Sequence, residues 1–459
     1  MKKITTLLAL ALAALAMTST APAQTAGTNT PAELPPWLTR PLSLADALNT
    51  AISQNATILK AQNDLEASHG LVVQTRAVAL PQVSATGQYK RTDRDAIEGF
   101  GFPGATLQPD QNWNAGIQIV QAIYEGGKLR AAIQAATATK QQAIAQYNTV
   151  LADTLLNVRI AYYDVLLAKQ QIVVHEASVN LLQKELDDQQ HRLDAGTVPH
   201  FNVLRAEVSV ANERPNLIHA RNSYRIAKNN LSNLLGYNLP RDVWENLPLN
   251  LTDTFDTSPW DVVLPDAIQQ ALSRRTELEA LRKQVELQQL NIVNAKAGYK
   301  PTVQVFAGYN WFNAQFTPPV DLDHDINGWN AGAQVSWDFF DGMLTRGKVI
   351  QAKAQFEHAK NDLTDQSRQI ELAVRTAYSD FIEARETLES QQKVVEEAEE
   401  SLREANARAD AGTGTQLDVL DAETSLTQAR TTQIQAEHDY VTARARLERA
   451  IGADLAPAK

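Results

Sequence analysis

The spacing of apolar residues changes along the chain from a helical period to a strand period and back again. Between 44 and 79, apolar side chains such as Leu48 and Ile52 recur at intervals of three and four residues, which predicts an amphipathic helix. Pro81 then ends the helix, because a proline pushes the residue before it out of the α region. Apolar and polar residues next alternate in "PQVSATGQYK" and "WNAGIQIVQAIY". This period of two predicts a pair of β-strands, each with one apolar and one polar face.

Two very long helices are predicted after the strands. The chain contains no proline from 128 to 195 or from 344 to 411, 68 residues each, and a helix of that length is ~100 Å long. Helices of globular proteins average about 11–12 residues, so these must be coiled-coil-like rods. Shorter helices are predicted over 201–235 and 415–451, each ~52 Å long, and Pro215 should kink the first of them. A leading and a returning short helix, placed end to end, match one long helix in length.

The same order of elements occurs twice, which indicates an internal duplication. Early in the repeat the offset is 220 residues, as between Tyr89 and Tyr309, and later it is 216, as between "RLDAGTVPHFNVLRAE" at Arg192 and "RADAGTGTQLDVLDAE" at Arg408. The change of offset indicates a four-residue insertion in an exposed loop between strands. The predicted organisation is an extended segment 24–43, a first repeat 44–236 with a β-hairpin at about 81–124, an equatorial strap 237–263, a second repeat 264–452 with a helix over 264–298 and a β-hairpin at about 301–341, and a C-terminal tail 453–459.

The first 23 residues have the form of a cleaved secretory signal peptide. Lys2 and Lys3 precede an apolar run from 4 to 17, and Ala21-Pro22-Ala23 is a small-residue cleavage site. Cleavage leaves 40 basic and 53 acidic residues, a net charge of −13, and so acidic a chain argues against nucleic acid as a partner. There is no cysteine, and the eight histidines lack the spacing of a metal site. No cofactor and no metal are therefore expected.

A secreted chain without a transmembrane helix can be soluble in the periplasm or can cross the outer membrane as β-strands. Beyond 23, no apolar stretch reaches the ~20 residues that a membrane helix needs. The strands favour the outer membrane, because aromatic residues lie towards their ends; the alternative is a half-buried sheet in a soluble protein. Since a barrel needs at least about eight strands, four strands require oligomerisation, and three copies would give twelve. The aromatic residues expected at the membrane interface are Trp113, Tyr124, Trp329, Trp337 and Phe340.

Several short motifs, taken together, make the chain similar to a known family. They are the duplicated "DAGT" turns at 194–197 and 410–413, "LDVLDAE" at 417–423, "YEGG" and "FDG" after the second strand of each hairpin, and the "P-x-V" strand starts at Pro81 and Pro301. With these motifs the mature chain resembles, over essentially its whole length, the TolC-like outer-membrane efflux proteins, also called outer membrane factors or channel-tunnels. The resemblance implies a mainly α-helical protein with a transmembrane β part. Three protomers, each contributing four strands, would form a twelve-stranded β-barrel that continues into a long periplasmic α-helical barrel.

The resemblance also implies a function and partners. Such a protein is not an enzyme; it is a passive exit duct of a tripartite efflux or type I secretion system, held in outer-membrane lipid with a large periplasmic part. It docks through a periplasmic adaptor (membrane fusion) protein to an inner-membrane pump of the RND, ABC or MFS type. The hairpin-tip residues at which the adaptor would dock are Gly196, Thr197, Gly412 and Thr413. The competing function is that of a soluble periplasmic coiled-coil adaptor or scaffold, which would also have long helical hairpins.

Asp418 and Asp421 follow the second tip, and two interpretations apply to them. Their spacing of three places both side chains on one face of a helix, and the resemblance implies that they ring the periplasmic entrance and set its cation selectivity. The local interpretation is that Thr415 and Asp418 form a capping box at the start of a helix. A capping box explains Asp418 better than Asp421, which lies nearly a turn further along.

Two positions in these tips differ from the family pattern. Gly414 stands where the family's better-known member has an arginine, and Asn202 stands where the acidic partner of that arginine lies. Asn202 and Arg205 also match the two aspartates in the first repeat, so only the second tip is acidic. The ionic latch of the family therefore lacks both partners here, and the gate must be held differently or more loosely.

Overall fold

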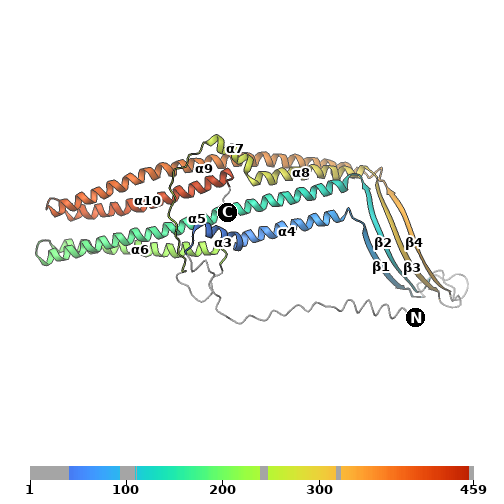
Figure 1. Ribbon diagram of the computed structural model, residues 1–459, viewed down its shortest axis with the longest axis horizontal. Helices are drawn as coiled ribbons and strands as arrows, with labels where there is room; N and C mark the ends of the chain where they lie inside the picture. Colours follow the sequence, from blue (N-terminus) through green and yellow to red (C-terminus); the bar gives the residue numbers. More distant parts are fainter. Residues whose placement is uncertain (1–40, 94–108, 110, 238–246, 317–321, 454–459) are drawn as a thin grey trace.

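The computed structural model describes residues 41–93, 109, 111–237, 247–316 and 322–453. The predicted signal peptide 1–23 lies outside these residues, as do most of the segment 24–43, part of the strap 237–263 and most of the tail 453–459. The four strands form one sheet, and α5–α6 and α9–α10 form helical hairpins. Figure 1 shows a rod of helices with the sheet at one end and the hairpin turns at the other. The described chain is therefore elongated, and its strands and its hairpin tips lie at opposite ends.

Each repeat contributes two short helices, a β-hairpin, a 67-residue helix and a returning helix. The first repeat contains α3 (Leu44–Gln54), α4 (Ala56–Ala77), β1 (Gln82–Arg91), β2 (Gln111–Glu125), α5 (Lys128–Asp194) and α6 (His200–Leu234). The second contains α7 (Leu264–Arg274), α8 (Thr276–Lys296), the 3₁₀ turn η2 (Ala297–Tyr299), β3 (Thr302–Phe316), β4 (Leu322–Ser336), α9 (Leu344–Asp410) and α10 (Gln416–Ile451). α6 continues as helix through Pro215. None of the helices in the described ranges combines the length and apolar character needed to cross a membrane.

The leading helices are not continuous, contrary to the prediction from their periodicity. Asn55 separates α3 from α4 and Arg275 separates α7 from α8, with extended ψ angles of 124° and 122°. The side chain of Asn55 caps α4 and also donates a hydrogen bond of 2.6 Å to the carbonyl oxygen of Leu234. Arg275 donates to the carbonyl oxygens of Arg449 and Ala450 at 3.3 Å. In both repeats the residue at the break thus donates hydrogen bonds to the last carbonyl groups of the returning helix. These carbonyl groups lack partners within the helix.

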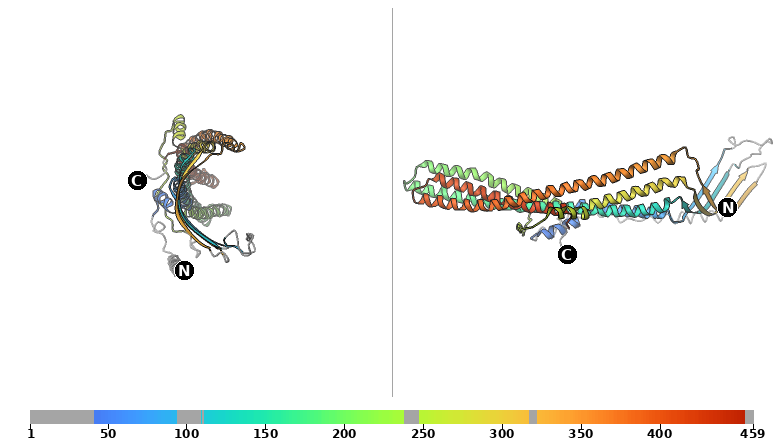
Figure 2. Two further views of the ribbon diagram at one scale, coloured as in Figure 1. Left: turned by 90° about the vertical axis from the view of Figure 1, so that its right-hand side faces the viewer. Right: turned by 90° about the horizontal axis from the view of Figure 1, so that it is seen from above.

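The four strands form one antiparallel sheet in the order β1-β2-β3-β4, so β2 and β3 join the two repeats. The duplication extends to single residue pairs: Tyr89 is opposite Trp113 in β1–β2, and Tyr309 is opposite Trp329 in β3–β4. The sheet curves when seen end-on (Figure 2, left). Because side chains alternate between the two faces, the register places on one face the apolar residues Val83, Ala85, Ile117, Ile119, Val305, Ala307, Ala333 and Val335. The other face carries Ser84, Thr86, Gln118, Gln304, Asn310, Asn330 and Gln334.

Two hydrophobic cores lie midway along the rod, one in each repeat. Tyr162 lies in the first core, while Phe381 and Tyr440 lie in the second. Phe255 from the strap packs against both cores, and the Tyr440 hydroxyl donates to the carbonyl oxygen of Ser258, also in the strap, at 2.9 Å. The strap therefore connects the two repeats at the level of their cores.

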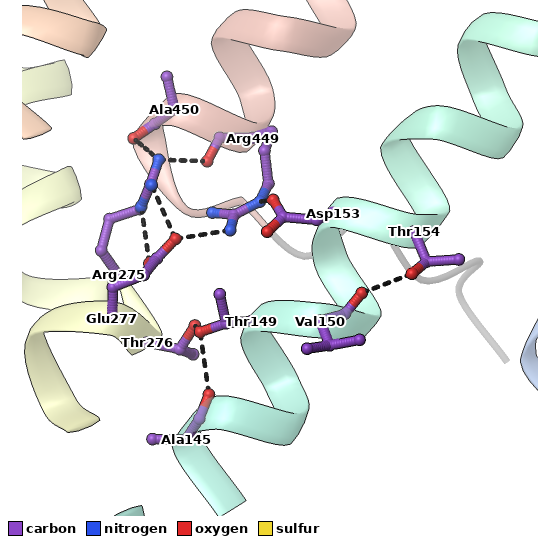
Figure 3. Close-up of polar contacts among 10 residues, drawn as sticks. All are labelled: Ala145, Thr149, Val150, Asp153, Thr154, Arg275, Thr276, Glu277, Arg449 and Ala450. Carbon is purple, nitrogen blue, oxygen red and sulfur yellow. Dashed lines mark hydrogen bonds and ion pairs between the residues drawn. The ribbon is translucent and has the colours of Figure 1, made fainter. Parts of the chain in front are cut away.

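The repeats also meet directly where α10 packs on α5, an interface that we call the α5–α10 seam. Arg449, buried at the end of α10, pairs with Asp153 of α5 at 2.8 Å and with Glu277 of α8 at 2.7 Å (Figure 3). Arg159 of α5 pairs with Glu448 of α10 at 2.5 Å. Charged groups therefore hold the equatorial end of this seam, in contrast to the apolar cores beside it.

Candidate functional site at the hairpin tips

The chain reverses direction at both hairpin tips with the same backbone hydrogen bonds. Gly196 and Gly412 have φ angles of 72° and 74°, in the left-handed region that glycine adopts without strain. The backbone N–H of each following residue, Thr197 and Thr413, donates at 2.9 Å to the carbonyl oxygen five residues earlier, as in a Schellman motif. All four residues are exposed. The predicted docking residues therefore occupy two equivalent, solvent-facing turns at one end of the molecule.

Asp418 completes a capping box with Thr415 at the start of α10. The Thr415 hydroxyl accepts from the backbone N–H of Asp418 at 3.3 Å, and the Asp418 carboxylate accepts from the backbone N–H of Thr415 at 2.9 Å. The hydrogen bonds that the Thr415 backbone N–H and hydroxyl donate to the Asp418 carboxylate, both at 2.9 Å, lower the pKa of this exposed group. The local interpretation of Asp418 is confirmed, and the carboxylate is ionised at neutral pH.

Asp421 is exposed one turn further along α10, beyond the capping box. Its backbone carbonyl accepts from the Ser425 hydroxyl at 2.8 Å, while its side chain takes no part in the cap. Capping therefore accounts for Asp418 and leaves the position of Asp421 unexplained. Both carboxylates face solvent at the tip, as a role at an entrance would require.

Gly414 is closely packed in the second tip. Its backbone N–H donates to the carbonyl oxygen of Arg408 at 2.9 Å. A Cβ atom at this position would lie 2.9 Å from the Arg408 Cβ and 3.1 Å from the Ala409 nitrogen. Since real Cβ atoms almost never approach so closely, an arginine at 414 would require this turn to shift. The turn itself therefore disfavours the side chain that the family pattern places there.

Two contacts that the sequence did not predict join the tips within one protomer. The Gln416 side chain donates to the backbone oxygen of Asn202 at 3.2 Å, and the Arg192 guanidinium lies 3.6 Å from the Asp410 carboxylate. Arg192 and Asp410 belong to the two copies of the "R-x-D-A-G-T" motif. The duplication could have indicated this contact, because neighbouring copies of the motif bring an arginine and an aspartate to the same level.

Directly behind the tips, a glutamate of the "LDVLDAE" motif is buried instead of solvated. Glu423 is 4% exposed, next to the small apolar cluster of Leu182, Val210 and Leu420. Burial, together with the charge of Glu185, raises the pKa of Glu423 to about 7. Within the described part of the chain, no three histidine, cysteine or acidic residues form a group that could hold a metal ion.

At the opposite end, four of the five predicted interface aromatics lie at strand ends. Trp113 is near the start of β2 and Tyr124 near its end, while Trp337 and Phe340 follow β4. Trp329 lies in the middle of β4, opposite Tyr309, so the prediction of a strand-end position is wrong for this residue. It is nevertheless 79% exposed, because it belongs to the apolar face of the sheet.

Comparisons with known proteins agree with this arrangement. A family model described as "Outer membrane efflux protein" matches residues 47–237 and 267–453. The chain is 24% identical over 418 residues to the outer membrane protein TolC of Escherichia coli (strain K12), covering 89% of this chain and 82% of TolC. It is 23% identical over 392 residues to the cobalt-zinc-cadmium resistance protein CzcC of Cupriavidus metallidurans, covering 85% of each. The solved structure of CusC superposes with a TM-score of 0.75 at 17% identity, covering 90% of this chain and 92% of CusC.

The fold and the tips together define an outer-membrane channel protein. Because the family model matches both repeats, the chain belongs to the outer membrane efflux protein family. Its fold class is the one expected from the sequence, a mainly helical protomer in two tandem repeats with a four-stranded antiparallel sheet. The family is one of channels and not of enzymes. Membership also decides against the competing function of a soluble adaptor or scaffold.

Proposed function

We propose that this protein is the passive exit duct of a tripartite efflux or type I secretion system, and that it reaches the outer membrane after cleavage of the signal peptide 1–23. Three protomers would bring their hairpin tips together around one entrance, ~100 Å of helix away from the sheet. The exposed turns at 196–197 and 412–413 would dock a periplasmic adaptor, which connects the duct to an inner-membrane pump of the RND, ABC or MFS type. The observation that carries the proposal is the exposed pair of carboxylates, Asp418 and Asp421, at the end of the molecule opposite the strands (Figure 1).

These carboxylates would act as a cation filter. Threefold symmetry gives six of them around the entrance, and rings of carboxylates favour cations over anions in channels. Asp418 is ionised because Thr415 hydrogen-bonds to its carboxylate and lowers its pKa. The matching positions of the first tip are not acidic, and Arg205 there lies over the Phe201 ring at 5.1 Å. The second tip would therefore determine the selectivity.

The entrance would be held by contacts within each protomer in place of the latch of the family. The hydrogen bond from Gln416 to Asn202 and the ion pair of Arg192 with Asp410 both connect one hairpin tip to the other. Surface contacts of this kind contribute about 0–1 kcal/mol each. A mouth held by two such weak links would open more readily than one held by several buried ion pairs.

Ion selectivity in planar bilayers tests the proposed filter. The double variant Asp418→Asn/Asp421→Asn removes both charges and keeps side chains that can still cap a helix. We expect the ratio of cation to anion permeability to fall several-fold and block by multivalent cations to weaken. The matched control is Asp362→Asn/Asp365→Asn, two exposed aspartates at the same spacing on α9. Unchanged selectivity in the tip variant, or an equal loss in the control, contradicts the proposed filter.

A further inference from the structure

The α5–α10 seam contains buried oxygen atoms that lack hydrogen-bond donors. Glu185 of α5 and Glu423 of α10 lie close enough for the charge of Glu185 to act on Glu423. Among the described residues, the buried Glu423 Oε2, Gln189 Oε1 and Gln416 Oε1 atoms have no hydrogen-bond partner. The Gln189 amide already donates to Glu185 at 2.8 Å. An ionised carboxylate needs hydrogen-bond donors, and the buried Glu423 Oε2 atom has none, so this site favours the protonated, neutral form of Glu423.

A second titratable group, His438, lies further along α10, closer to the equator. The His438 Nε2 atom is 2.8 Å from the Asp164 carboxylate of α5, and its Nδ1 atom is 3.0 Å from the Asp439 carboxylate. A neutral imidazole has one N–H, whereas the imidazolium has two. Only the protonated ring can therefore donate to both carboxylates. Its bond to Asp164 is a direct, charge-assisted link across the seam.

We propose that the α5–α10 seam is a pH-sensitive joint, closed while Glu423 and His438 are protonated and loosened when they lose their protons. Loss of the Glu423 proton places a second charge beside Glu185 in a buried site. Loss of the His438 proton removes a charge-assisted bond between the two helices. α10 belongs to the hairpin that carries Asp418 and Asp421, so a rise in pH would free the second tip; this consequence for the entrance rests on the proposed function.

Loss of the proton from Glu423 and loss of the proton from His438 both destabilise the closed seam. Burial and the charge of Glu185 raise the pKa of Glu423 from 4.5 to about 7. The closed seam is therefore fully stable with respect to this group below about pH 4.5, and it loses stability as the pH rises to about 7. Burial alone would lower the pKa of His438, but the hydrogen bonds and charges of Asp164 and Asp439 raise it above 6.5. Its contribution is complete below about pH 6.5 and is lost as the pH rises through the raised value.

Other titratable groups also lie along the seam. Burial raises the pKa of Glu185 and that of Glu437, the neighbour of His438 on α10. Asp188 and Arg192 lie beside Glu185 on α5. A cavity of about 610 Å³ next to Glu423 is also lined by His175 of α5 and by Glu213 and His219 of α6. His175 and Glu213 form a pair at 2.7 Å that joins α5 to α6. The Phe255 ring packs edge-on beside the His438 ring. Ion pairs of the described residues near the seam include Arg159–Glu448 and Arg449–Asp153 at the end of α10, and Arg430–Glu399 between α10 and α9.

A single thiol in the seam can report how often it opens, because the chain has no native cysteine. Ser178→Cys places the thiol on α5 where the Ser178 hydroxyl accepts from Thr427 of α10 at 3.1 Å. In the purified full-length protein, the rate of alkylation is divided by the rate for denatured protein at the same pH, which removes the effect of thiolate formation. Each proton that is released when the seam opens changes the equilibrium between the closed and the open seam by up to about tenfold per pH unit. We therefore expect the protection of this thiol to fall on the order of a hundredfold between about pH 5 and 7.

Two further variants in the Ser178→Cys protein have distinct expected profiles. Glu423→Gln is neutral at every pH, so protection should stay high and the fall below about pH 7 should disappear. His438→Gln keeps one donor without a charge, so protection should already be reduced at acid pH and the decrease at higher pH should be lost. The matched control is Glu399→Gln, which removes a carboxylate that pairs with Arg430 on the α9 side of α10. It should keep the profile of the parent.

Three results would overturn the proposal. The first is an unchanged pH profile in both Glu423→Gln and His438→Gln. The second is the same profile for a thiol introduced by Ala384→Cys, a buried position in the core of the second repeat, because that would indicate unfolding of the whole protein. The third is recovery of protection at alkaline pH on addition of Ca²⁺ in the parent but not in Glu423→Gln, which would make the seam a metal site. None of these measurements depends on conductance, so the joint and the proposed function can fail separately.

Discussion

Gly414 and Thr415 determine how the second hairpin tip ends and how α10 begins. The tight approach of Gly414 to Arg408 leaves no room for a side chain at 414, and the next residue caps the helix. In the first tip the corresponding position before the helix is Pro199, which provides no side-chain cap. The two tips therefore share a turn but start their returning helices differently, and the cap is what fixes Asp418 in place.

Thr415→Ala should loosen the start of α10. Loss of an N-cap threonine costs about 1 kcal/mol, so amide exchange in the first turn of the helix should become roughly fivefold faster. Hydrogen–deuterium exchange of peptides covering 416–421 measures this change. Thr424→Ala is the matched control, since that hydroxyl donates only within the helix, to the carbonyl oxygen of Leu420 at 2.8 Å. Equal exchange rates in Thr415→Ala and the unmodified protein would contradict the role of the cap.

The exposed carboxylates of the tip could be predicted from the sequence, whereas the burial of Glu423 could not. Asp418 follows Thr415 at capping-box spacing, and a local pattern of this kind depends on neighbours in the chain. Glu423 lies in the same acidic motif, yet it is buried beside a cavity that is also lined by Leu182 of α5 and Asn212 of α6, far away in the sequence. Such a contact becomes visible only when the helices are placed side by side.

The helices could be predicted to different degrees for a related reason. The long helices begin at Lys128 and Leu344, as predicted, because the glycine turns directly before them mark these boundaries locally. The break at Asn55 was missed, since the helical period continues on both sides of it. Its stabilising partner is the carbonyl oxygen of Leu234, 179 residues away. A break held by a long-range hydrogen bond leaves little trace in the local pattern.

α10 is joined to its neighbours by a buried ion-pair network at its C-terminal end (Figure 3). Arg449 bridges Asp153 and Glu277, while Arg275 binds both Glu277 and the last carbonyl groups of the helix. Burial would raise the pKa of Glu277, but Arg275 and Arg449 lower it. The three helices α5, α8 and α10 are therefore fixed to each other by two guanidinium groups.

Removal of Arg449 should destabilise this junction strongly. Arg449→Leu leaves the half-exposed Asp153 without this partner and Glu277 with Arg275 alone, and each lost hydrogen bond between charged groups costs about 1.5–3 kcal/mol. We expect the thermal midpoint of the helical part, followed by circular dichroism, to fall by several degrees more than in Arg385→Leu. That control removes an arginine 4.0 Å from a fully exposed carboxylate, Asp261, an arrangement worth at most about 1 kcal/mol. Equal midpoints for the two variants would show that the network contributes little.

The duplication also constrains how three protomers assemble. Residue pairs in β1–β2 and β3–β4 correspond under the offsets of 220 and 216: Gln82 is opposite Val120, and Thr302 is opposite Ser336. The described sheet has β1 and β4 at its edges. In a closed trimeric barrel β4 must pair with β1 of the next protomer, and this junction is equivalent to β2–β3 within the chain.

The register between protomers follows from that equivalence. Gln118 of β2 is opposite Gly308 of β3, and applying the two offsets places Gln334 opposite Gln88 of the partner subunit. Directly opposite residues have Cα atoms about 4.5–5.5 Å apart, within the range of a disulfide. Gln88→Cys/Gln334→Cys should therefore form covalent trimers on a non-reducing gel, and Gly87→Cys/Val335→Cys tests the neighbouring pair on the other face.

Any such disulfide must join different protomers, because β1 and β4 occupy opposite edges of the sheet in one chain. The control Gln88→Cys/Asn330→Cys is shifted by four residues, or ~13 Å along the strand, and should stay monomeric on the gel. A one-residue slip would move every side chain of β1 to the other face, and the apolar residues would then face the wrong side of the barrel wall. Covalent trimers from the shifted pair, with none from the two predicted pairs, would mean that the barrel closes in a different register and that the internal symmetry ends at the edge of the protomer.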